Sequence, residues 1–166
     1  GGTTLSFGLE GDRGELLEAA GTITIEVSEF FTVGGSLAFE KSTDRVTLGN
    51  GNEVDVDLLT VGGTGLGGFV GLNRDDLANR IGFTVSGVEF GLAILTDKLD
   101  GARVWTSVQA TVGSAVFTGT SRVVLGATGL SVAVNEAASD GTVVDYGSGS
   151  RVFAIATGPS TGPTLT

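Results

Sequence analysis

Apolar and polar residues alternate along much of the chain, and strict alternation is typical of a half-buried β-strand. Between residues 22 and 28 every second position is apolar. Ile23, Ile25 and Val27 therefore share one face of a predicted strand, while threonine, glutamate and serine side chains occupy the other. This segment predicts a strand with one apolar face and one polar face.

The alternation changes phase in the second half of the chain. Odd positions are apolar from 81 to 85, and even positions are apolar from 88 to 94. A β-bulge or bend near Gly87 accounts for this change, because one extra residue shifts the alternation by one position. We also expect Gly113 to bend or interrupt the long apolar stretch at residues 104–117.

Three segments interrupt the predicted strands. Residues 62–68 contain two Gly-Gly pairs and predict a loop. Residues 15–20 and 74–80 are the two places where a short helix is expected, and Asn73 is suited to cap the second. Turn signals recur about every 10 to 15 residues, which is typical of antiparallel all-β domains. We expect one all-β module over 1–166, with antiparallel sheets in a sandwich, roll or solenoid and at most one or two short helices.

The composition restricts the chemistry available to the chain. It has 29 Gly among 166 residues, no His, Cys or Met, and a formal net charge of -10. The usual base at neutral pH, the thiolate nucleophile and every imidazole or thiolate metal ligand are therefore absent. With 19 acidic and 9 basic residues, the chain lacks a basic patch for nucleic acid. No run approaches the ~20 apolar residues that span a bilayer. We expect no enzyme, no nucleic-acid partner and no membrane insertion.

Two features are candidates for ligand binding. Glu53, Asp55 and Asp57 share one face of a predicted strand, and Ca²⁺ takes oxygen ligands from carboxylates. The alternative for these residues is an acidic face in contact with solvent. Trp105 is the aromatic residue best suited to stack on a sugar, and the alternative is that it fills a gap in the core or packs at an interface. No cofactor other than calcium is indicated.

The two ends of the chain are similar in sequence. Residues 2–6 (GTTLS) match residues 162–166 (GPTLT) at the glycine, the second threonine and the leucine. Because the chain also lacks a methionine, we expect a piece of a longer polypeptide in which this module repeats; chance similarity is the alternative. The expected seam between neighbouring copies consists of Thr3, Thr4, Leu5, Phe7, Pro163, Thr164 and Leu165.

Several short segments resemble, in the same order, the long repeats of giant bacterial secreted and cell-surface proteins, including adhesin-like and haemolysin-annotated ones. These segments are residues 21–27 (GTITIEV), 35–41 (GSLAFEK), 57–62 (DLLTVG), 87–93 (GVEFGLA), 129–135 (GLSVAVN) and 141–146 (GTVVDY). The resemblance implies an extracellular or cell-surface β-module that serves as a stalk, fibre or adhesive layer. Many such proteins carry calcium-binding nonapeptide repeats, and this chain has no Gly-Gly-x-Gly-x-Asp tandem.

These observations together predict a structural role. We expect the module to join end to end with copies of itself, through covalent tandem linkage or by strand addition, and so to build a fibre, stalk or surface layer. The alternative is a carbohydrate-binding or calcium-binding β-module of a secreted protein.

Overall fold

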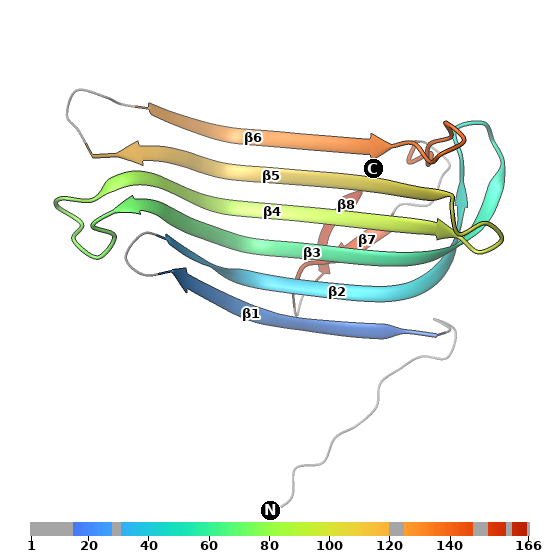
Figure 1. Cartoon of the computed structure of the whole chain (residues 1–166), viewed down its shortest axis with the longest axis horizontal. Coiled ribbons are helices and arrows are strands. Elements are labelled where there is room, and N and C mark those ends of the chain that lie inside the picture. Colours follow the sequence, from blue (N-terminus) through green and yellow to red (C-terminus); the bar gives the residue numbers. More distant parts are fainter. Residues whose placement is uncertain (1–14, 28–30, 120–124, 148–152, 159–160, 166) are drawn as a thin grey trace, which may run out of the picture.

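The chain folds into strands without helices in the part described by the computed structural model, residues 15–27, 31–119, 125–147, 153–158 and 161–165. Six strands in sequence order form one open antiparallel sheet, and two short strands form a separate hairpin (Figure 1). The predicted all-β antiparallel fold is confirmed. The strands are β1 (Leu17–Val27), β2 (Phe31–Thr47), β3 (Glu53–Leu72), β4 (Ile81–Asp97), β5 (Val104–Thr118), β6 (Leu125–Glu136), β7 (Phe153–Ala156) and β8 (Thr161–Leu165).

Three local predictions are wrong. The glycine-rich segment 62–68 is not a loop but the middle of β3, the longest strand, with 20 residues. Residues 17–20 of the expected first helix begin β1, where pairing with β2 overrides their modest helix propensity. Residues 74–80 form turns instead of a helix, and the Asn73 side chain donates to the carbonyl of Asn79 at 3.1 Å.

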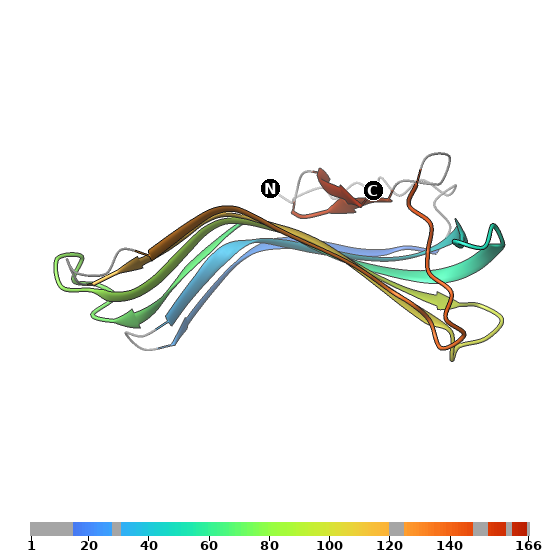
Figure 2. The same cartoon turned by 90° about the horizontal axis from the view of Figure 1, so that it is seen from above.

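A row of glycines crosses the sheet and accounts for its bent shape. Gly65 in β3, Gly87 in β4 and Gly129 in β6 have φ angles of 60°, 63° and 64°. Such left-handed conformations cost a glycine little, because it has no Cβ. Gly113 of β5 lies against Gly87, and a Cβ added at Gly87 would come 3.4 Å from its Cα atom. Figure 2 shows the resulting sheet from above, bent along its length instead of flat.

The left-handed glycines also reverse the alternation of side chains. Val85 before Gly87 and Val88 after it line the same hollow, together with Phe83 and Phe90. The odd apolar positions on one side of Gly87 and the even positions on the other therefore face the same way. The irregularity that the sequence predicted at Gly87 is confirmed, because the register of β4 with β3 shifts between Val88 and Val85.

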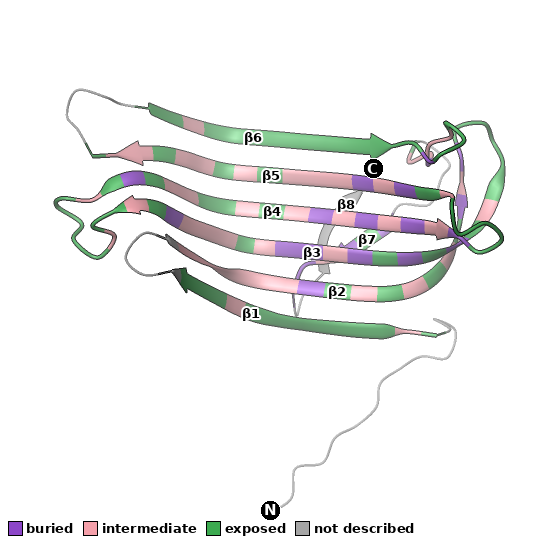
Figure 3. Ribbon diagram, viewed as in Figure 1, coloured by how far each residue is buried: buried purple, intermediate pink, exposed green. Residues whose placement is uncertain are grey.

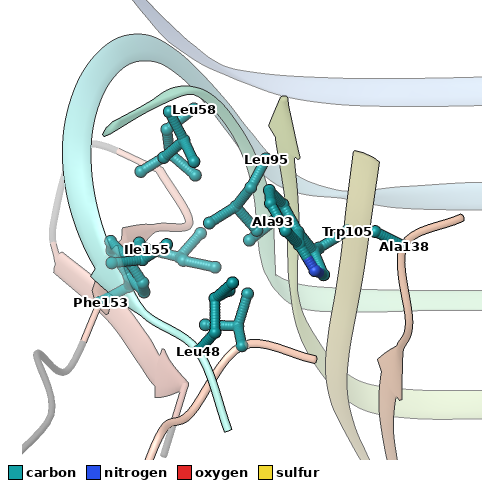
Figure 4. Close-up of a cluster of buried hydrophobic side chains, with 11 residues drawn as sticks. Leu48, Leu58, Ala93, Leu95, Trp105, Ala138, Phe153 and Ile155 are labelled. Atoms are coloured by element: carbon teal, nitrogen blue, oxygen red, sulfur yellow. The ribbon is translucent and has the colours of Figure 1, made fainter. Parts of the chain in front are cut away.

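The hydrophobic core lies on one face of the sheet, between the sheet and the segment that follows β6. Ile155 and Phe153 of β7 pack over the strands (Figure 4), and Val144 belongs to the same cluster. We call this side of the sheet the covered face. The core residues on the covered face are all buried: Val46, Leu48, Val56, Leu58, Ala93, Leu95 and Trp105.

The opposite side of the sheet, the open face, is also apolar. Its centre is a row of paired residues, one from each strand from β1 to β6: Ala19, Phe39, Val61, Leu92, Val108 and Val134. No described segment covers this row, and Phe39 and Val134 remain 42% and 46% exposed. Figure 3 shows that the buried residues of the six-stranded sheet lie in parts of its inner strands, while β1 and β6 are almost entirely exposed. The sheet is thus a single layer that is covered on one side only.

Candidate functional site

The acidic residues predicted as a cation site lie on the first part of β3. Glu53, Asp55 and Asp57 are all exposed on the open face, as the alternation predicted. The register with β2 places Arg45 directly opposite Asp55. Nε of Arg45 donates to Oδ1 of Asp55 at 2.7 Å, and Nη2 donates to Oδ2 at 3.2 Å. The central carboxylate is therefore already bound to a guanidinium group.

This ion pair sets the electrostatics of the acidic strand. The hydrogen bond from Arg45 lowers the pKa of Asp55, and the same bond raises the pKa of Arg45. A cation at Asp55 would compete with Arg45 for both carboxylate oxygens. Across the part of the chain that the structure describes, no group of three or more acidic residues is arranged to hold a metal ion. Calcium binding by Glu53, Asp55 and Asp57 stays a prediction.

Trp105 lies in the core and not on the surface. Its side chain is fully buried, and Nε1 donates to the carbonyl oxygen of Thr142 at 3.0 Å. The guanidinium of Arg103 lies over the indole ring, 5.0 Å from its centroid. A sugar could stack on this ring only after the segment around Thr142 had moved away.

Arg103 connects the turn between β4 and β5 to the segment after β6. Its Nη1 donates to Oδ2 of Asp97 at 2.6 Å, and its Nη2 lies 2.9 Å from Oδ2 of Asp140. Asp97 is nearly buried and also accepts a hydrogen bond from the backbone N–H of Leu99 at 2.7 Å. These bonds hold the covering segment against the end of the sheet, so we assign Arg103 a structural role.

Asp140 provides a test of this connection. Hydrogen bonds from the hydroxyl and the backbone N–H of Thr142, and then the charge of Arg103, lower the pKa of Asp140. A lowered folded-state pKa contributes stability above the ordinary aspartate value of about 3.9, and this contribution disappears as the pH falls through the lower folded-state value. We expect Asp140→Asn to reduce stability near neutral pH and to flatten its loss in acid, as measured by urea unfolding between pH 7 and 2.

The exposed Asp57→Asn variant is the control for this experiment. It removes a charge from the same chain without touching the Arg103 connection. If Asp140→Asn and the wild type lost stability in parallel as the pH fell, the assigned role of Asp140 would be wrong.

The predicted seam is described at one end only. Thr3, Thr4, Leu5 and Phe7 lie outside the described residues. Pro163, Thr164 and Leu165 lie in β8, where Leu165 pairs with Phe153 and Thr164 pairs with Ala154 of β7. The C-terminal half of the seam therefore forms a hairpin within the chain, and its pairing with a neighbouring copy stays a prediction.

The structure reveals a different pair of edges that sequence analysis missed. β1 and β6 are the outer strands of the sheet, and no described strand pairs with their outer sides. β6 is exposed at eleven of its twelve residues. An unpaired strand edge presents a row of N–H and C=O groups to which another chain can add. The absence of charge on Gly126–Asn135 was the signal in the sequence, but the position of β6 at an edge depends on the whole sheet.

Comparisons with protein-family models, curated proteins and solved structures found no match to this chain. No helix among the described residues is long and apolar enough to cross a membrane.

Proposed function

We propose that this chain is a structural module that assembles with copies of itself into a fibre or surface layer, through pairing of β6 of one copy with β1 of the next. The observation that carries this proposal is the pair of open sheet edges. The resemblance of residues 21–27, 35–41 and 87–93 to repeats of giant bacterial surface proteins supports an extracellular location.

The directions of the strands favour this mode of assembly. All five neighbouring pairs from β1 to β6 are antiparallel, so β1 and β6 run in opposite directions. A second copy in the same orientation therefore presents a β1 that is antiparallel to β6 of the first. The contact uses two different surfaces and leaves one edge free at each end, and such head-to-tail contacts build open filaments.

The edges also lack the features by which soluble proteins prevent such pairing. Lysine, proline and inward-pointing charges are the common protective devices on edge strands. β6 has the sequence LGATGLSVAVNE, without lysine, arginine or proline and with one acidic residue at its end. β1 has the sequence LEAAGTITIEV, also without lysine or proline, and its charged residues are Glu18 and Glu26 near its two ends. Both strands are long enough to form an extended ladder of main-chain hydrogen bonds.

Electron microscopy of the material isolated from its source, beside size-exclusion chromatography of the 166-residue chain, tests the proposal. Six strands about 4.8 Å apart give an axial repeat of about 29 Å per module, with the strands perpendicular to the fibre axis. A strictly monomeric chain with no native polymer would contradict the proposal. If the axial repeat instead matched the length of a strand, the strands would run along the fibre, which would support joining through the predicted terminal seam.

A peptide with the sequence of β1 is expected to stop filament growth. Peptide 17–27 would occupy the free edge of β6 and shorten the filaments in a concentration-dependent way. The matched control peptide carries Thr22→Pro and Thr24→Pro, which remove two backbone donors and disfavour addition to a sheet. Light scattering and microscopy measure the effect, and equal inhibition by both peptides would argue against edge pairing.

A further inference from the structure

The open face carries a surface that edge pairing leaves uncovered. The central row from Ala19 to Val134 crosses all six strands, and a second row beside it contains Phe90, Ala110 and Val132. Addition of strands at β1 or β6 extends these rows sideways but does not remove them from water. The open face therefore needs a partner other than the one that occupies the edges.

Charge is confined to one end of this face. Lys41, Arg45, Glu53, Asp55 and Asp57 lie near the end where β2 turns into β3, and Arg45 is paired with Asp55. The two central rows contain no charged residue. A chain with a net charge of -10 would repel a copy of itself over most of its surface. The open face is where an identical chain can approach without burying an unpaired charge.

The size of the face matches a stable interface between proteins. Six strands about 4.8 Å apart give a sheet about 29 Å wide, and a length of roughly 36 Å along the strands, about 11 residues at about 3.3 Å each, gives an area of about 1,000 Å². A stable interface covers roughly 800 Å² on each partner, whereas the largest apolar patch on a monomer is about 300–600 Å². We propose that the open face binds the open face of a second copy, so that two sheets form a sandwich with a shared apolar core.

The shape of the face also suits such pairing. At the row of glycines it contains a hollow of about 330 Å³, lined by Leu66, Val70, Phe83, Val85, Val88 and Phe90 among other residues. Two apolar sheets pack about 10 Å apart with their side chains interdigitated. A two-fold axis between the sheets brings the same surface from both copies together. This pairing goes beyond the proposed function, because it joins faces and leaves β1 and β6 free.

Substitutions at two neighbouring residues of β5 distinguish pairing through the open face from pairing through the edges. Ala110 lies on the open face opposite Phe90 and Val132, and Thr111 is exposed on the other side of the same strand. β5 is an inner strand, so neither residue touches an edge. Ala110→Lys adds a charge without removing a core side chain, and we expect it to weaken face pairing about 100-fold, because two lysines would meet at an apolar interface. Thr111→Lys is expected to leave pairing unchanged.

Sedimentation equilibrium with peptide 17–27 in excess measures face pairing alone, because the peptide occupies the edge of β6 and so prevents its pairing with β1 of another copy. The expected result is a dimer for the wild type and for Thr111→Lys, and a monomer for Ala110→Lys with an unchanged circular dichroism spectrum. If Ala110→Lys fails to fold, Val112→Lys, the next residue of β5 on the open face, replaces it against the same Thr111→Lys control.

Three outcomes would overturn the proposal. The wild type could remain monomeric with its edges blocked, or both lysine variants of β5 could weaken the dimer equally. The wild type could also bind to neutral lipid vesicles and sediment with them, which would assign the open face to a lipid surface. Filaments of Ala110→Lys that persist as single sheets, where the wild type forms paired sheets, are the expected result, because the edge strands β1 and β6 are unchanged in this variant.

Discussion

Replacement of Trp105 by alanine is expected to destabilise the chain by about 3–5 kcal/mol, the cost typical of removing a large buried aromatic side chain. The side chain is fully buried and belongs to the cluster that joins the sheet to β7. The variant also loses the hydrogen bond from Nε1 to Thr142 and the stacking contact with Arg103. Urea unfolding at a fixed, low protein concentration measures the loss as a shift of the midpoint.

Val104→Ala is the matched control for the tryptophan variant. Val104 is the neighbouring residue on the same strand, points to the opposite face and is 38% exposed. We expect its loss to cost about 1 kcal/mol or less. Equal losses at Trp105 and Val104 would mean that the covered face does not hold the core. A variant of Trp105 that stayed stable but lost binding to a glycan would favour the carbohydrate-binding alternative.

The strand predictions succeeded where the signal is local. Alternation identified the strand at residues 22–27, and the change of phase identified the bulge at Gly87. Each of these features depends on the order of a few neighbouring residues, because successive side chains of a strand point to opposite faces. The acidic face of Glu53, Asp55 and Asp57 was found for the same reason.

The predictions failed where distant residues decide the structure. Residues 62–68 predicted a loop, but a Cβ at Gly62 would collide with the carbonyl oxygen of Ala156, so glycine is needed there for β7 to approach the sheet. Arg45 was not recognised as the partner of Asp55, because the two residues meet only through the register of β2 with β3. The glycine at position 62 therefore allows β7 to pack closely against the sheet and does not indicate a turn.

The proposed edge site and the open face follow from the same property of the sheet. A meander of six strands has two edges and two faces, and in the part of the chain that the structure describes the C-terminal segment covers only part of one face. Among the described residues, no other segment covers the rest of the apolar surface of the sheet. Assembly with other copies would remove this surface from water, which is the basis of the proposed structural role.

Replacement of Arg103 by methionine is the second large effect that we expect. Asp97 is 4% exposed, and its Oδ2 lies 2.6 Å from Nη1 of Arg103. Removal of the cation leaves a buried carboxylate without its counter-charge, which typically costs about 3–5 kcal/mol. At this chain length, 1 kcal/mol lowers Tm by about 2–4 °C, so calorimetry should resolve the change readily.

Arg45→Met is the control that separates burial from ion pairing. Arg45 and Asp55 also form a close ion pair, but their side chains are 62% and 55% exposed. An exposed pair contributes about 0–1 kcal/mol, because water already solvates both charges.

The double variant Asp97→Asn with Arg103→Met should recover part of the loss, since the amide needs no cation. If Arg45→Met cost as much as Arg103→Met, or if the double variant recovered nothing, the stability of the covered end would not depend on neutralising Asp97. In that case the loss in Arg103→Met would be assigned to the contact of Arg103 with Trp105.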